Sequence, residues 1–209
     1  GIKVAVIDTG VDLSHPALQE ALAPASEWWD FYGNDAIPQE EGSFADAGYG
    51  HGTNVAGIIR QIAPRATILP VRVLGPDGMG DVASVAAGIQ WAMAKGARII
   101  NLSLGSEDSL KAVEEVIKQA TAKGIFVVAS TGNTGDKNVT WPASSAAEAK
   151  NRLRISVTSV DENDKKSTFA TYGRAVELSA PGELVYGPAP ELNMAAWSGT
   201  SQAAPMASG

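Results

Sequence analysis

The chain has 209 residues, a formal net charge of −7 and no cysteine, and its hydrophobic and charged fractions of 44% and 19% are ordinary for one globular domain. The acidic balance, without any basic cluster, argues against nucleic-acid binding, and the lack of cysteine excludes disulfides and thiolate chemistry. No apolar run approaches the ~20 residues of a membrane span.

Short apolar runs rich in Val and Ile alternate with amphipathic runs along the chain. In chain order, the pattern predicts a strand over 2–7, a long acidic loop or lid over 28–50, a helix over 52–63, a strand over 67–74, a helix over 81–95, a strand over 97–104, a helix over 108–123, and strands over 125–130, 154–160 and 175–178. Repeated βα units predict an α/β fold in which helices cover a parallel sheet. We find no linker composition and expect one domain.

A serine at the start of a helical pattern is the first candidate for chemistry. Ser201 lies in Trp197-Ser-Gly-Thr-Ser-Gln-Ala-Ala-Pro205, where a helix-favouring run follows Gly199. A helix N-terminus favours developing negative charge. The Ser201 hydroxyl is therefore a candidate nucleophile, provided that the chain supplies a base and an acid to orient it.

The chain has two histidines that could supply the base. His15 precedes Pro16, which predicts a capping or turn role at a helix start. His51 lies between two glycines ahead of an amphipathic run, where another backbone or a substrate can approach closely; taken alone, it could equally cap the helix. Asp8 ends a buried strand pattern, at the edge of the sheet where ligands bind, although an Asx turn is the simpler explanation of an isolated Asp-Thr-Gly.

Together these residues form the constellation of a serine hydrolase, because Asp8 can orient His51 and His51 can take the proton of Ser201. The chain resembles the subtilisin-like serine proteases, or subtilases, whose triad has this order along the sequence. The resemblance covers almost the whole chain and is carried by three motifs: Val6-Ile-Asp8-Thr-Gly10-Val11, His51-Gly-Thr-Asn-Val-Ala-Gly57 and Gly199-Thr-Ser201-Gln-Ala-Ala-Pro205.

The resemblance implies a three-layer α/β/α fold with a mostly parallel central sheet, and a serine endopeptidase that cleaves peptide bonds through an acyl-enzyme. It assigns Asn133, in a Gly-bounded loop after a strand, to the oxyanion hole together with the Ser201 amide. An extended peptide substrate would pair with exposed backbone. The substrate-binding residues implied are Gly78, Met79, Gly80, Ser103, Leu104, Gly105, Ser130, Thr131, Gly132 and Thr140.

Three positions depart from the family's pattern. Thr140 stands where the family often has glycine, so we expect a shallow specificity pocket that prefers small or medium apolar side chains. Asn54 replaces a second, non-catalytic histidine, and Gln202 replaces the methionine that usually follows the nucleophile. Because His51 must be neutral to act as a base, we expect activity to rise through roughly pH 6–7.5, around an ordinary histidine pKa of ~6.5.

We expect no cofactor in the chemistry and no catalytic metal. The calcium loop that many subtilases insert after the histidine-bearing helix has no counterpart here. Acidic side chains between residues 30 and 46 are of the type that binds structural calcium, but their spacing matches no ligand motif, and a solvated acidic loop is the favoured interpretation. These residues are Asp30, Asp35, Glu40, Glu41 and Asp46.

Other functions are weaker explanations of the same residues. The Asp8-Thr9-Gly10 motif also occurs in aspartic proteases, but no second copy supplies the partner carboxylate. Gly78-Met-Gly80-Asp-Val-Ala83 resembles a dinucleotide-binding turn, but Asp77 and Asp81 place negative charge where a pyrophosphate would lie. An α/β-hydrolase is excluded because its catalytic histidine follows its serine in the chain, and no histidine follows Ser201 here. The main alternative is an inactive subtilase-like domain that binds or scaffolds.

Partners and location follow from the resemblance alone. We expect a monomer that binds protein or peptide substrates, and a propeptide or inhibitor could occupy the same cleft. Secretion is favoured by the resemblance. An intracellular location stays open, because an acidic, cysteine-free intracellular member of the family would have the same composition. Only residues 202–209 follow the serine, and we interpret 1–209 as one catalytic domain truncated at its C-terminus.

Overall fold

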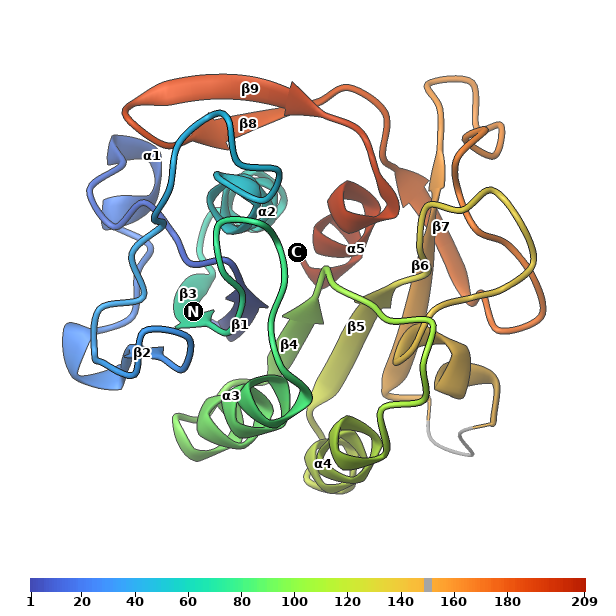
Figure 1. The fold of residues 1–209 in the computed structure, drawn as a ribbon, viewed down its shortest axis with the longest axis horizontal. Coiled ribbons are helices and arrows are strands. Elements are labelled where there is room, and N and C mark those ends of the chain that lie inside the picture. Colours follow the sequence, from blue (N-terminus) through green and yellow to red (C-terminus); the bar gives the residue numbers. More distant parts are fainter. Residues whose placement is uncertain (149–151) are drawn as a thin grey trace.

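A seven-stranded sheet forms the centre of the molecule in the computed structural model, which describes residues 1–148 and 152–209 (Figure 1). Its strands lie in the order β2-β3-β1-β4-β5-β6-β7, and every neighbouring pair is parallel. Their bounds are β1 Lys3–Asp8, β2 Trp29–Asp30, β3 Thr67–Arg72, β4 Ile99–Leu102, β5 Phe126–Ser130, β6 Arg154–Val160 and β7 Leu178–Pro181.

Helices cover both faces of this sheet. On one face lie α2 (His51–Ile62) and α5 (Thr200–Ser208), and on the other lie α3 (Val82–Ala94) and α4 (Lys111–Ala122) (Figure 1). The three-layer α/β/α architecture expected from the sequence is therefore confirmed. The remaining helical segments are the short α1 (Pro16–Gln19) and two 3-10 turns, Ala25–Glu27 and Ala143–Glu148. No helix among the described residues is long and apolar enough to span a membrane.

Strand β1 shows why the chain folds into these layers. Its side chains alternate between the two faces, so Val4 and Val6 pack in the α2 cluster while Ala5 and Ile7 pack in the α3 and α4 cluster. Burying an aliphatic side chain of this size contributes roughly 1.5–3 kcal/mol. A strand that is apolar at every position is therefore stable only where both faces are covered.

The strand order places a crevice beside β1. From β1 the chain passes to the edge strand β2 and returns to β3, which lies beside β1. It then crosses to the other side of β1 and continues through β4 to β7. Ligands of open α/β sheets bind outside the carboxyl ends of strands at such a reversal. The ends of β1 and β4, at Asp8 and Leu102, therefore mark the expected site.

Two expectations about the strands need correction. The last strand of the sheet is β7 at Leu178–Pro181 rather than 175–178, because Ser156 pairs with the backbone before it, at Ala175 and Glu177. An antiparallel hairpin of β8 (Val185–Ala189) and β9 (Asn193–Trp197) packs over α2 and was not predicted. It contains Pro188, which is tolerated on edge strands and weakens the strand signal in the sequence.

The stretch 28–50 is largely irregular, as expected, but its central part is held in place. It contributes the edge strand β2 and a bridge from Gln39 to Val11. Glu40 in this stretch is only 4% exposed. The segment is therefore anchored to β1 and β3 rather than free to act as a lid along its whole length.

Candidate active site

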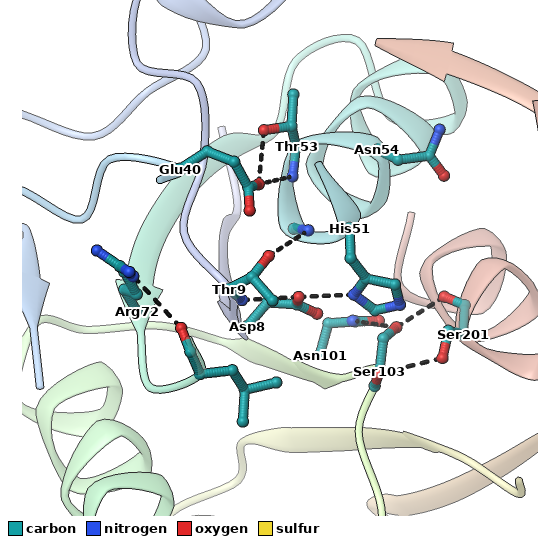
Figure 2. Close-up of polar contacts among 12 residues, drawn as sticks. Asp8, Thr9, Glu40, His51, Thr53, Asn54, Arg72, Asn101, Ser103 and Ser201 are labelled. Carbon is teal, nitrogen blue, oxygen red and sulfur yellow. Dashed lines mark hydrogen bonds and ion pairs between the residues drawn. The ribbon is translucent and has the colours of Figure 1, made fainter. Parts of the chain in front are cut away.

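Asp8 and His51 form a direct pair at the end of β1. Asp8 Oδ1 lies 2.7 Å from His51 Nδ1, and the Asp8 side chain is 1% exposed against 17% for that of His51 (Figure 2). The same carboxyl oxygen accepts a hydrogen bond from the Thr9 amide at 2.8 Å, so a contact with the adjacent backbone and the histidine contact occur together. A buried carboxylate bonded to Nδ1 fixes the tautomer that leaves Nε2 free to accept a proton.

The approach of α2 to β1 depends on a glycine. A Cβ at Gly52 would lie 2.1 Å from the carbonyl oxygen of Gly10, so no other residue fits at this position. The Gly52 amide donates to Thr9 Oγ1 at 2.9 Å. The Gly-His-Gly sequence therefore places the histidine at the helix start, directly above the end of the strand.

Two opposing effects act on the pKa of His51. Burial lowers the pKa, whereas the Asp8 charge, the Asp8 hydrogen bond and the charge of Glu40 raise it, and the net result is a pKa above 6.5. The pair thus stabilises the imidazolium that a general base becomes when it takes a proton. The ordinary pKa assumed from the sequence is therefore too low.

Ser201 occupies the first turn of α5, next to the carboxyl end of β4. Its Oγ donates to the carbonyl oxygen of Ser103 at 3.1 Å, and Ser103 Oγ donates to the Ser201 carbonyl at 2.8 Å (Figure 2). Within the described residues Ser201 makes no hydrogen bond to His51. Such bonds are often long before a substrate binds. The ring of His51 also makes an edge contact with the ring of Trp197, with centroids 6.0 Å apart.

Asn133 lies beside the start of α5 with its amide oriented. Its Oδ1 accepts hydrogen bonds from the Thr200 amide at 2.9 Å and from Thr200 Oγ1 at 3.0 Å. The Thr200 hydroxyl also accepts from the Gly132 amide at 3.1 Å. Because the oxygen is occupied, the Nδ2 group is the end left to donate to a ligand near Gly199 and Ser201.

A cleft of about 340 Å³ opens beside His51. It lies between the turn after β3 and the turn after β4. The residues expected to bind substrate that line it are Gly78, Met79, Gly80, Ser103, Leu104 and Gly105. Helix α3 separates these two segments in the chain. The structure nevertheless brings both of them beside His51.

Thr140 fills the space between two other candidates. A Cβ at Gly105 would lie 2.5 Å from Thr140 Oγ1, and one at Gly132 would lie 2.8 Å from Thr140 Cγ2. The Thr140 amide also donates to the Thr131 carbonyl at 3.0 Å. The threonine side chain thus occupies the gap between the segments that follow β4 and β5.

Ser130 and Thr131 are placed differently from the other candidates. Ser130 is 3% exposed, and Thr131 is fully buried with its hydroxyl donating to the Thr171 carbonyl at 3.2 Å. Neither side chain faces the cleft. Their backbone leads directly into Gly132 and Asn133.

The acidic residues weighed as calcium ligands are mostly engaged within the protein. Arg72 pairs with Asp30 at 3.0 Å and with Glu41 at 2.7 Å, and Glu40 Oε2 accepts from the amide and hydroxyl of Thr53 at 3.1 and 2.9 Å. Among the residues that the structure describes, no group of three or more acidic or histidine side chains could hold a metal ion. The solvated acidic loop expected from the sequence is wrong for Asp30 and Glu40, which are buried.

One supporting residue was not predicted from the sequence. Asn101 donates to Ser103 Oγ at 2.9 Å and accepts from Ser208 Oγ at 2.8 Å, which docks α5 against β4. Its signal was a polar residue inside an apolar strand pattern. His15 does cap α1, as expected, since its Nδ1 accepts from the Ala17 amide at 3.2 Å.

The chain is similar to known proteins over its full length. A model of the subtilase family matches residues 1–209. Thermitase from Thermoactinomyces vulgaris is 39% identical across 100% of this chain and 73% of its own, and subtilisin BL from Lederbergia lenta is 36% identical across 100% and 74%. The crystal structure of a cold-adapted subtilisin-like serine proteinase matches with a TM-score of 0.85 and 31% identity, over 100% of this chain and 73% of that one.

Proposed function

The chain belongs to the subtilase family and is a subtilisin-like serine endopeptidase, and from this premise we propose that Ser201 is its nucleophile, His51 its base and Asp8 the acid that orients the base. What supports the assignment most is the 2.7 Å contact between Asp8 and His51 at the mouth of the cleft. The helix that carries Ser201 begins beside the same cleft wall, at Ser103.

The proposed reaction proceeds in two halves. Ser201 Oγ leaves its hydrogen bond to Ser103, attacks the peptide carbonyl carbon, and gives its proton to His51 Nε2, while Asp8 stabilises the imidazolium. His51 then returns the proton to the departing amine, which leaves an acyl-enzyme. Water, deprotonated by the same histidine, hydrolyses that ester and restores Ser201.

Asn133 supplies the proposed stabilisation of the oxyanion. Its Nδ2 group and the Ser201 amide would donate to the negative oxygen of the tetrahedral intermediate. Thr200 holds the Asn133 carbonyl at 2.9 Å, so the donor is oriented before the substrate arrives. A donor that needs no reorientation stabilises the transition state more than the ground state.

We expect the substrate to bind as an extended strand. Gly78 to Gly80 and Ser103 to Gly105 present backbone on either side of the cleft, where a peptide can pair by strand addition. Thr140 fills the space between Gly105 and Gly132 and would shorten a specificity pocket there, so we expect side chains of small or medium apolar residues to fit best at the cleaved position. A cleavage profile on a peptide library that is dominated by Phe or Tyr would overturn this specificity.

A serine-reactive fluorophosphonate tests the proposed nucleophile. The folded protein should form a covalent adduct on Ser201, and the Ser201→Ala variant should form none. Mass spectrometry of the digested adduct identifies the residue. The absence of an adduct on the folded parent protein would favour the alternative, a subtilase-like domain that binds without catalysis.

Location, partners and calcium are further expectations. We expect secretion, a monomeric state and binding of a propeptide or inhibitor in the cleft, and no cofactor enters the proposed chemistry. The coding sequence upstream of Gly1 tests secretion by showing or lacking a signal segment. Unfolding midpoints measured with calcium and with a chelator test for a structural calcium ion. We expect the acidic stretch around Arg72 to bind none, so the midpoint should not change on its account.

A further inference from the structure

Two buried side-chain amides meet between the helices that carry His51 and Ser201. Gln202 Nε2 donates to Asn54 Oδ1 at 3.3 Å, although the residues are 148 positions apart in the chain. Asn54 is fully buried and Gln202 is 2% exposed. Figure 2 shows Asn54 on α2, just beyond His51 on the same helix.

Backbone segments pack tightly around these two amides. Asn54 Nδ2 is buried without a hydrogen bond among the described residues, and a Cβ at Gly187 of β8 would lie 2.8 Å from it. On the other side, a Cβ at Gly199 would lie 2.9 Å from Gln202 Oε1. An unpaired buried amide is costly, so the single bond between the two side chains favours one relative position of the helices.

The sequence positions of the pair connect it to the catalytic residues. Asn54 lies three residues after His51, close to one helical turn, and Gln202 follows Ser201 directly. His51 and Ser201 are not hydrogen-bonded to each other in this structure; Ser201 is bonded instead to Ser103. The distance that the proton must cross therefore depends on how α2 and α5 are placed.

We propose that Asn54 and Gln202 form a positioning bridge, which sets the separation of His51 and Ser201 by joining their two helices. The inference rests on the proposed triad and adds two residues that do not touch the substrate. Gln202 acts through the backbone of its neighbour Ser201, and Asn54 acts through the first turns of α2. A displacement of about 1 Å at reacting groups can cost up to roughly 100-fold in rate, so even a weak bond at this place has a kinetic effect.

The test compares three variants with the parent protein. Gln202→Met keeps the length of the side chain and removes the bond, Asn54→Leu removes it from the other side, and the double variant replaces both buried amides by apolar groups. Gln61→Leu is the matched control, because Gln61 lies on the same helix and donates to the exposed hairpin at Tyr186 O, 3.1 Å away. We measure kcat and KM on a peptide substrate per site titrated with fluorophosphonate, together with the unfolding midpoint.

A positioning role predicts a specific combination of results. In Gln202→Met and Asn54→Leu, kcat per titrated site falls by roughly ten-fold while KM changes by less than about two-fold. In the double variant the unfolding midpoint recovers, because no amide is left unpaired, but kcat stays low. Gln61→Leu keeps the parental kcat.

Two results would overturn the bridge. Parental kcat per titrated site in both single variants would show that the contact has no kinetic role. Recovery of kcat together with stability in the double variant would show a purely structural role. If the parent protein itself forms no adduct on Ser201, the proposed triad fails and the bridge fails with it; an adduct on the parent together with unaffected variants refutes the bridge alone.

Discussion

Replacing Glu40 by glutamine tests whether the buried Glu40 carboxyl, near the Asp8–His51 pair, makes the stability of the fold depend on pH. Glu40 is 4% exposed and its Oε2 accepts from both the amide and the hydroxyl of Thr53, in the first turn of α2 (Figure 2). Burial raises the pKa of Glu40 from 4.5 to about 7, and the Asp8 charge adds to the rise, although the nearby hydroxyls of Thr9 and Thr53 oppose it.

The rise in this pKa makes stability depend on pH with a definite sign. In the unfolded chain Glu40 loses its proton near pH 4.5, whereas in the folded protein it keeps the proton up to about pH 7. Its contribution is therefore fully present below pH 4.5 and is lost as pH rises through 7. The corresponding difference in the free energy of unfolding is about 3 kcal/mol.

Glu40→Gln should remove this dependence, because an amide cannot ionise but can still accept the two Thr53 hydrogen bonds. The free energy of unfolding of the parent should fall between about pH 4.5 and 7.5 by up to 3 kcal/mol more than that of the variant. Urea unfolding at four pH values measures this pH dependence of the free energy of unfolding. Every protein compared also carries Ser201→Ala to prevent self-digestion. Glu20→Gln, at an exposed carboxyl near α1, is the control and should keep the parental slope. Equal slopes in the parent and Glu40→Gln would refute the reasoning.

Three further predictions concern catalysis. The raised pKa of His51 places the midpoint of the acid limb of kcat/KM above pH 6.5, since the base must be neutral; a midpoint at or below 6.5 on a peptide substrate contradicts it. Asn133→Ala removes one donor to a charged oxygen, worth about 1.5–3 kcal/mol, so kcat should fall roughly 10- to 150-fold with little change in KM. Unchanged kcat would exclude Asn133 from the oxyanion hole. Thr140→Gly empties the space between Gly105 and Gly132 and should shift cleavage toward larger side chains in a peptide library, whereas an unchanged profile would place the specificity pocket elsewhere.

The sheet and the main helices could be predicted because their signals are local. The apolar run of β1 and the three-to-four spacing of α2 are properties of adjacent residues, and the predicted bounds of these two elements differ from the observed ones by one residue at each end. The hairpin β8–β9 was missed because Pro188 and the exposed side chains Tyr186 and Met194 break the apolar pattern. Its formation depends on packing over α2, which no local pattern records.

The sequence by itself determined the residue types of the candidate site and their order along the chain. Asp8, His51 and Ser201 each lie in a motif of adjacent residues, so their types and order follow directly from the chain. Tertiary structure alone decided how those residues are supported. Glu40 is buried rather than solvated, and Gln202 meets Asn54 across 148 residues. The physical reason is that burial and the pairing of buried polar groups depend on which distant segments come together, and the pKa of a carboxyl or the partner of an amide follows from that environment.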